Sequence, residues 1–500
     1  MTKKPRRRHP GPPAQAARPA AAGDPLDALP DLWEAIAAGD LAKAEIETST
    51  TMALPRIASE MDAGQADEFI AGTLVGAARR RATPESAAFL RLLVSLGSPT
   101  VKRAAGQALA ELTARNVYPA EWVTEAGKAV PRRAWSKHDI FGDTDLIAVT
   151  FGYGDAEHAV AAQVQRSILP VVFNIVITEE VDKLLEVLPT DLTPFERYEE
   201  IGLGEARRRL EDGLKRAEDD PDVSTTLRAF WPLAMSRIRR LPEEDGPPEA
   251  DADRAAAVDE FLSSPQAEGL DPDSARFWAQ VLTGYTARIA GEPPDQIGPH
   301  MLPVVLLGHA PAYFTLTSSQ REAMEPAVTA WVAWSAARRG FDEAASQRLA
   351  QALPEVFGGF EEAYDDPDNA RSRAYLADVA APDANPVTLV DIRLRRLFAV
   401  PDAEAGSDPS DSGNRRAIAE AEFGDCTPPD GMTSEEFVAA VGRVLDELWA
   451  GDPSQTWDRA RLLIASGADR HDALHNLAAR KLSAGYVARD LDPRRIPILI

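Results

Sequence analysis

Apolar residues recur at helical spacing over most of the chain and change to strict alternation in one segment. In TPESAAFLRLLVSLGSPTVKRAAGQALAELTARN, Thr83 and Ser98 occupy helix N-cap positions, and a proline follows each at the first helical position. The second half carries an apolar stripe, made by Val101, Ala105, Ala108, Leu109 and Leu112. This segment therefore predicts two antiparallel helices.

The helical pair needs neighbours, because one pair cannot bury its apolar face alone. The upstream segments DLWEAIAAGDLAKAE and GQADEFIAGTLVGAARRR have the helical spacing to supply them. We therefore predict a helical domain over residues 29–130. The pair itself resembles a single HEAT-type repeat, and the domain is expected to be HEAT-like in consequence.

The apolar period changes from about 3.6 to about 2 residues after Asp145. Ile147, Val149 and Phe151 alternate with smaller residues, and the segments HAVAAQVQ and PVVFNIVIT follow after short turns. This alternation predicts an antiparallel three-stranded meander over residues 145–178. The helical segments EEVDKLLEVL and GEARRRLEDGLKRAE are expected to cover one face of it, which makes residues 131–240 an α+β domain.

Polar segments divide the remaining chain. LPEEDGPPEADAD predicts an acidic linker over 241–253, and PDAEAGSDPSDSGN predicts a disordered linker over 401–432. Between them, residues 254–400 return to helical spacing and predict a helical domain. Trp331 and Trp334, three residues apart on this spacing, are expected in its core.

The two ends of the chain differ in character. Residues 1–28 are rich in basic residues, proline and alanine, and predict a disordered leader. Thr433 opens the capping box TSEE, which predicts a small helical domain over 433–500. The predicted fold class is mainly α with one small α+β domain.

Two segments resemble parts of other proteins. PHMLPVVLLGHAPAYFTLTSSQREAMEPAVTAWVAWSAARRG and DRHDALHNLA are similar to segments of uncharacterised bacterial proteins built from helical modules. The matching positions are mostly apolar or capping residues. The resemblance therefore implies a shared architecture and transfers no catalytic residue.

Net charge narrows the choice of partners. The chain carries a formal charge of −25, and its first ten residues contribute +5, so the remainder stands at −30. A body this acidic repels phosphate backbones, and nucleic acid is expected to bind only through the basic N-terminal tail. Another protein is the expected partner.

Other compositional features bear on location. No apolar stretch approaches the roughly 20 residues that cross a bilayer, and the N-terminus lacks the apolar core of a signal peptide. The single cysteine, Cys426, excludes an intramolecular disulfide and a cysteine-cage zinc site. We therefore predict a cytoplasmic protein that does not contact membranes.

The strongest chemical signal is the segment GADRHDALHNLAARKLSAG. His471 and His475 lie four residues apart on one helical face with Asp472 between them, as two ligands and an acid do in the zinc-protease pattern H-E-x-x-H. A divalent transition metal could bind here, with Asp472 as acid or base. The candidates for a third ligand are Glu447, Asp458, Asp490 and Asp492.

A packing role for the two histidines is the favoured interpretation. The apolar stripe of this helix consists of Leu474, Leu477, Ala478 and Leu482. Both histidines border it, and His471, nearer its centre, is expected to be the more buried. Asp472 is also shorter than the Glu that zinc proteases use as a base.

A second set of metal-type side chains flanks the first predicted strand. His138, Asp139, Asp143 and Asp145 precede the strand, and Asp155, Glu157 and His158 follow it. The strand between them spans about 26 Å, so the two sets are not expected to form one site. The chain has none of the motifs for phosphate loops, dinucleotide sites or nucleophile elbows. The arginines of EARRRLEDGLKR indicate a solvated face.

These observations favour a cytoplasmic protein-interaction or scaffold protein without catalysis of its own. Two alternatives stay open. One is a metal-dependent hydrolase that uses the HDALH helix. The other is a nucleic-acid-associated factor tethered by the basic N-terminal tail.

Overall fold

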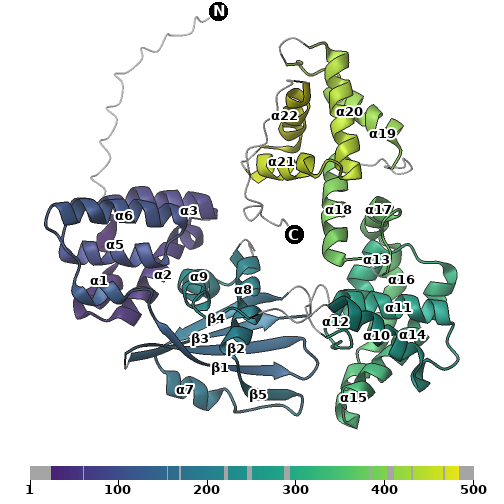
Figure 1. Ribbon diagram of the computed structural model, residues 1–500, viewed down its shortest axis with the longest axis horizontal. Helices are drawn as coiled ribbons and strands as arrows, with labels where there is room; N and C mark the ends of the chain where they lie inside the picture. Colours follow the sequence, from purple (N-terminus) through teal and green to yellow (C-terminus); the bar gives the residue numbers. More distant parts are fainter. Residues whose placement is uncertain are drawn as a thin grey trace, which may run out of the picture.

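The structure is a computed structural model. It describes residues 24–59, 61–154, 156–167, 170–218, 223–244, 250–286, 293–382, 384–401, 410–429, 432–465 and 468–482. The described chain is mainly helical and contains one small antiparallel sheet (Figure 1), which confirms the predicted fold class at this level. The predicted disordered leader lies outside the described residues as far as residue 23, and the prediction is wrong for Pro25–Ala28, which form a short helix with Leu26 fully buried.

A series of helices precedes the sheet. They are η1 (Pro25–Ala28), α1 (Pro30–Ala38), α2 (Leu41–Ala58), α3 (Ala63–Phe69), η2 (Ile70–Leu74), α4 (Val75–Arg81), α5 (Pro84–Leu96), α6 (Pro99–Ala114) and η3 (Glu121–Glu125). The predicted caps of the central pair are confirmed. Thr83 accepts a hydrogen bond from the Ser86 amide and Ser98 accepts one from the Val101 amide, each at 3.2 Å.

The sheet has five strands, so the predicted number of three is wrong. The strands are β1 (Val130–Asp139), β2 (Thr144–Tyr153), β3 (Ala156–Gln165), β4 (Val171–Thr178) and β5 (Glu196–Ile201), in the spatial order β4-β3-β2-β1-β5. All neighbouring strands are antiparallel. The prediction missed β1 (VPRRAWSKHD) and β5 (ERYEEI), because charged residues interrupt any apolar alternation in both.

Helices cover both faces of the sheet (Figure 1). Helices α8 (Leu203–Glu218) and α9 (Thr225–Ile238) lie on one face, where Leu210 and Leu214 share a core with Ile147. Helix α7 (Val181–Val187) lies against the other face, where Leu188 at its end packs on Ala148 and Ala161. The two helical segments expected on one face therefore lie on opposite faces.

A buried ion pair joins the N-terminal helices to the sheet. The side chains of Glu45, from α2, and Arg237, from α9, are both inaccessible to solvent and form an ion pair. Tyr153 at the end of β2 donates to Glu45 Oε2 at 2.7 Å, and Arg237 Nε donates to His158 Nε2 on β3 at 2.8 Å. The same hydrophobic core extends from α1 to α9, so helices and sheet form one packed unit around this pair.

A second helical region follows the sheet and begins at residue 250, so the predicted linker over 241–253 is wrong for its last residues. The region comprises α10 (Ala250–Leu262), η4 (Pro265–Ala267), α11 (Pro272–Tyr285), α12 (Met301–Pro303), η6 (Val304–His309), α13 (Ala310–Tyr313), α14 (Ser318–Arg338), α15 (Glu343–Ala350), α16 (Leu353–Asp365), α17 (Pro367–Leu376) and α18 (Pro386–Ala399). Trp331 and Trp334 are buried in its core, as predicted. Phe141, from the turn between β1 and β2, belongs to this core as well.

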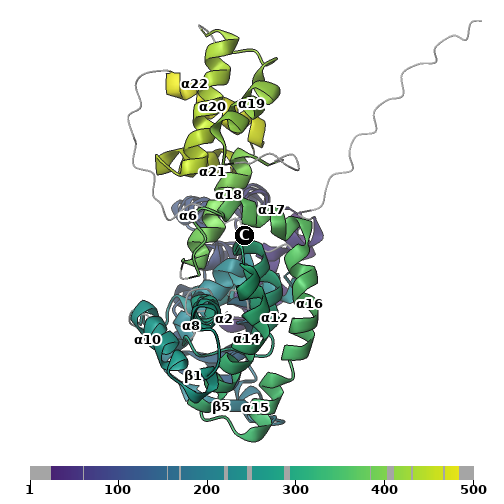
Figure 2. The same cartoon turned by 90° about the vertical axis from the view of Figure 1, so that its right-hand side faces the viewer.

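Helix α18 leads from this region to the C-terminal helices, which stand beyond the rest of the chain (Figure 2). These are α19 (Ser412–Phe423), α20 (Ser434–Ala450), α21 (Ser454–Ala465) and α22 (Arg470–Leu482). The Thr433 capping box is confirmed. The prediction of a disordered linker over 401–432 is wrong for α19, because Phe423 packs against Phe437 and Arg415 pairs with Asp446.

The buried pair allows a stability test. The variant Arg237→Met should lower the free energy of unfolding by about 3–5 kcal/mol, because Glu45 would remain buried without a compensating cation. Urea unfolding followed by circular dichroism measures the change. The matched control Arg240→Met removes an exposed arginine of the same region and should change stability by less than about 0.5 kcal/mol. Equal effects of both variants would contradict the importance of the pair.

Candidate functional site

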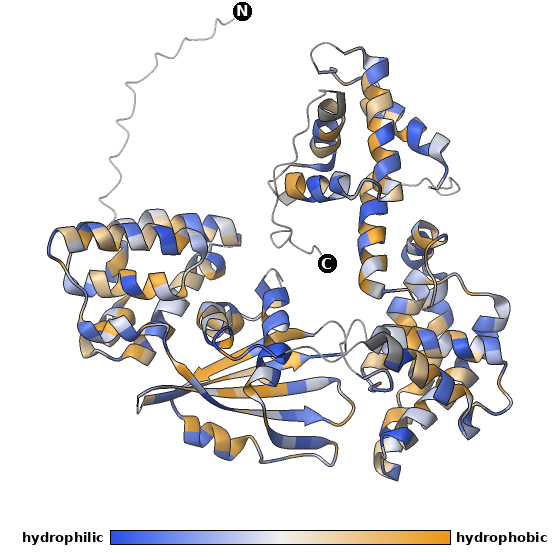
Figure 3. Ribbon diagram, viewed as in Figure 1, coloured by the Kyte–Doolittle hydropathy of each residue, from blue (hydrophilic) through white to orange (hydrophobic). Residues whose placement is uncertain are grey.

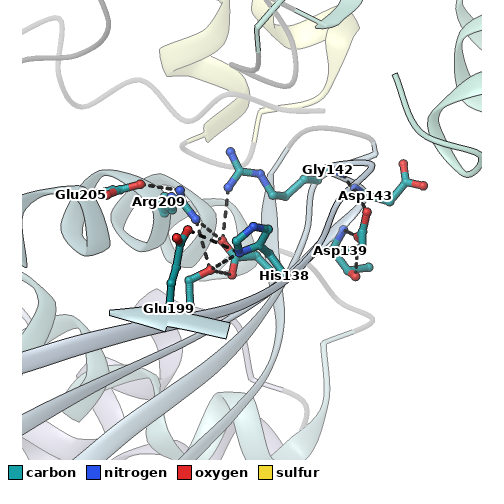
Figure 4. A network of polar contacts seen from close by, with 11 residues as sticks. His138, Asp139, Gly142, Asp143, Glu199, Glu205 and Arg209 are labelled. Atoms are coloured by element: carbon teal, nitrogen blue, oxygen red, sulfur yellow. Dashed lines mark hydrogen bonds and ion pairs between the residues drawn. The ribbon is translucent and has the colours of Figure 1, made fainter. Parts of the chain in front are cut away.

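A network of polar side chains that includes His138 and Arg209 lies at one end of the sheet (Figure 4), and Asp145 makes several of its contacts. The Asp145 side chain is fully buried and accepts hydrogen bonds from Ser136 Oγ at 2.7 Å and from Arg209 Nη1 at 2.8 Å. Arg166 Nη1 lies 3.4 Å from the same carboxylate. His138 Nδ1 lies 3.0 Å from Ser136 Oγ.

Sheet register and helix packing bring these groups together. Ser136 and Asp145 lie on the neighbouring strands β1 and β2, while Arg209 reaches them from α8. Glu205, one helical turn before Arg209, pairs with that arginine. Two guanidinium groups therefore face two carboxylates, and this balance lets the charges remain buried or half-buried.

The arrangement differs from a nucleophilic triad. In a triad the carboxylate holds the histidine, and the histidine faces the nucleophile. Here the serine lies between the carboxylate and the imidazole, and its hydroxyl hydrogen points to Asp145. Ser136 is also fully buried and out of reach of a substrate. The network is suited to fixing the strand ends in place.

A cleft of about 480 Å³ lies beside His138, between the sheet and the second helical region. Its polar groups serve the turn that connects β1 to β2. Asp139 Oδ1 accepts from the amides of Phe141 and Gly142, each at 2.8 Å. Arg339 donates to the carbonyl oxygen of Ile140. The cleft is thus a junction that the turn and the helices build together.

Asp143 attaches this turn to the helical region. Its carboxylate accepts from the amide of His300 at 2.9 Å and from that of Met301 at 3.1 Å, where α12 begins. Burial raises the pKa of the Asp143 carboxyl to about 6. The close approach requires glycine at position 298, because a Cβ there would lie 2.3 Å from Asp143 Oδ1. Glycine is also favoured at position 142, because the backbone there has a φ of 87°, a conformation that other residues rarely adopt.

The second half of the predicted metal set lies at the far end of β2, as the strand length predicts. Glu157 pairs with Gly152 and His158 with Phe151 in the register of β2 and β3. Asp155 lies outside the described residues. His158 accepts from Arg237, and burial together with that cation lowers the pKa of the imidazole to about 3.

The HDALH histidines each pack on an aromatic ring. His471 stacks on Phe423 with ring centroids 4.3 Å apart, and its Nε2 lies 3.5 Å from Cys426 Sγ. His475 contacts Phe437 at 4.7 Å. The prediction that His471 is the more buried is wrong: His471 is exposed and His475 is half-buried. His471 lies in the first turn of α22.

The other candidates for this metal site have separate roles. Asp472 is exposed in the first turn of α22. Glu447 accepts from Thr456 Oγ1 at 2.8 Å, and Asp458 pairs with Arg461 at 3.1 Å. Asp490 and Asp492 lie outside the described residues. Within the described ranges, no three His, Cys, Asp or Glu side chains gather where they could hold a metal ion.

Three charged residues that form these contacts were not identified from the sequence. Arg237 had a weak signal, because it lies four residues after buried Leu233 on the apolar side of α9. Arg209 was assigned to a solvated face, yet it reaches back to the sheet. Glu45, among small residues of α2, gave no signal of its own.

Comparisons of the chain with known protein families, with curated proteins and with solved structures find no match. In the part of the chain that the structure describes, no helix is both long and apolar enough to cross a membrane.

The depressed pKa of His158 gives a pH-dependent prediction. An unfolded histidine binds a proton near pH 6.5, whereas folded His158 stays neutral to about pH 3, so acid favours the unfolded chain. His158→Gln removes this titration. The stability gap between wild type and variant should narrow by about 2 kcal/mol between pH 7 and pH 5, measured by urea unfolding. A gap that does not change with pH would contradict the assignment.

Proposed function

We propose that the chain is a protein-interaction scaffold that binds an extended segment of a partner protein along strand β4. The observation that carries this proposal is the exposure of Phe173 and Val176, which are 43% and 45% exposed on a strand at the edge of the sheet. An apolar edge strand offers both unpaired backbone groups and side-chain contacts to an added strand.

The two edges of the sheet differ in a way that supports this assignment. Strand β4, with the sequence VVFNIVIT, has no charged residue, whereas β5, with ERYEEI, has four (Figure 3). Charged edges discourage strand addition, and uncharged apolar edges permit it. The β4 edge therefore lacks the protection that the opposite edge of the same sheet has.

The length of the regular edge is sufficient for a short partner strand. The register of β3 and β4 shifts at Phe173, and pairing is regular from Asn174 to Thr178. Phe173, at the irregularity, places an aromatic side chain at the end of this segment. A partner strand of about five residues would pair with the backbone and contact both apolar side chains.

Charge selects the partner. Glu179 and Glu180 follow β4 directly, and the Asp40 carboxylate lies close enough to help burial raise the pKa of Glu179. The chain as a whole carries −25. An apolar partner segment with lysine or arginine at one end therefore complements this edge.

Other features fit a scaffold. The α5–α6 pair resembles a HEAT-type repeat, and such pairs commonly build binding surfaces. The histidines of α22 pack on aromatic rings, which favours a role in folding over a catalytic one. The single cysteine is typical of a cytoplasmic protein, and we propose that location.

A photo-crosslinking residue at position 173 tests the proposal in the cell that makes this protein. The expected crosslink joins β4 to one short apolar and basic segment of a single partner. A synthetic peptide of that segment should bind the wild type, and Val176→Lys should weaken binding by about tenfold or more by placing a charge on the apolar edge. Val387→Lys, at an exposed valine on α18, is the matched control.

A proline in the middle of the peptide distinguishes strand addition from side-chain contact alone. Proline removes one backbone donor, so binding should be lost if the peptide forms a strand. Unchanged binding of the proline peptide, or equal loss with Val387→Lys, would refute the proposal.

A further inference from the structure

A groove of about 750 Å³ lies among the N-terminal helices. Unlike the uncharged β4 strand, it is lined by several charged side chains. It runs between α2, α3, the start of α6, and α9, which lies beside α2 (Figure 1). Five cationic side chains line it, against two carboxylates, Asp67 and Glu218. The cations are Arg56, Lys102, Arg228, Arg239 and Arg240. In a chain with a net charge of −25, this is a local reversal of sign.

Three of these cations have no counter-ion among the described residues. Lys102, Arg239 and Arg240 are exposed, and no carboxylate in the described part of the chain forms an ion pair with any of them. Arg56 donates to the carbonyl oxygen of Glu218 at 2.8 Å, but its Nε is buried without a hydrogen-bond partner among the described residues. The groove therefore has unused positive charge and an unused donor.

Lys102 lies where the local electrostatic potential disfavours a cation. It is the fourth residue of α6, near the positive end of the helix dipole, where an anion would be favoured. Partial burial of its side chain, together with the nearby cation Arg239, lowers the pKa of the lysine. An anion that binds between two such cations offsets their mutual repulsion, so its binding is favoured.

The floor of the groove is apolar. Its lining includes Met52, Ile70, Leu96 and Met235, all at least nine-tenths buried, and half-buried Trp231. Trp231 donates from its indole nitrogen to the Leu214 carbonyl at 2.8 Å, which fixes the orientation of the ring. A ligand that fills this groove would contact the Trp231 ring at the floor and the positive charges at the rim.

We propose that this groove binds a small phosphorylated molecule with a flat apolar body. The phosphate contacts the three exposed cations at the rim, and the body lies on the apolar floor beside Trp231. Phosphate fits because its oxygens accept from several lysine and arginine donors at once. The volume is in the range of small-molecule sites. This site is independent of β4, so either proposal can fail without the other.

Isothermal titration of the full-length protein with three probes tests the assignment. The probes are 1-naphthyl phosphate, inorganic phosphate and 1-naphthol, which separate the charged and apolar parts of the ligand. We expect 1-naphthyl phosphate to bind more tightly than either of the other two. Its affinity should fall as salt is added, because exposed charges are screened.

A charge-matched pair of variants locates the binding. In Lys102→Gln/Arg239→Gln/Arg240→Gln, the affinity for 1-naphthyl phosphate should fall by about tenfold or more. The control Arg103→Gln/Arg115→Gln/Arg348→Gln removes three other exposed arginines that form no ion pair with a described carboxylate. It should bind like the wild type.

Three outcomes would overturn the proposal. They are equal binding to the two triple variants, binding of 1-naphthol as tight as that of its phosphate, and no binding of 1-naphthyl phosphate to the wild type at millimolar concentration. Because all six substituted residues are exposed, circular dichroism should show both triple variants folded, and a loss of binding then reports on the groove.

Discussion

The buried ion pair between Glu45 and Arg237 is the constraint on which the first half of the molecule depends. Neither side chain reaches solvent, so each charge depends on the other. Further hydrogen-bond partners for the two side chains can come only from the protein. Tyr153, His158 and the Gly127 amide supply most of these contacts. Because these contacts come from two strands and a loop while the ion pair comes from two helices, they join the helices to the sheet.

The turn between β1 and β2 plays the corresponding part for the second half. It places the Phe141 ring in the core of the helical region and the Asp143 carboxylate on the first amides of α12. The network around Asp145 fixes the strand ends from which this turn projects. Strand ends, turn and helices are thus held by one continuous set of contacts, and the cleft beside His138 lies at their junction.

The sequence predicted those parts of the fold that local patterns specify. Caps at Thr83, Ser98 and Thr433 and the alternation that begins at Ile147 depend on neighbouring residues, which a single sequence displays. The strands β1 and β5 could not be predicted, because their charged residues find partners only after the sheet has formed.

The polar sites escaped prediction for a related reason. Ser136, Asp145 and Arg209 come from three elements, and nothing in the spacing of any one of them shows that they meet. His471 and His475, by contrast, share one helix and therefore form a motif that is visible in the sequence. Their rings turn out to rest on Phe423 and Phe437, aromatic residues of other helices.

The separation of the buried pair along the chain has a consequence for synthesis. Glu45 and Arg237 are 192 positions apart, so the glutamate leaves the ribosome long before its cation exists. At a translation rate of roughly 5–20 residues per second, about 10–40 s pass between the synthesis of Glu45 and that of Arg237. The Glu45 carboxylate has no cation to pair with in this interval. During that interval the Glu45 carboxylate must stay hydrated, so this part of the core can close only after Arg237 has been made.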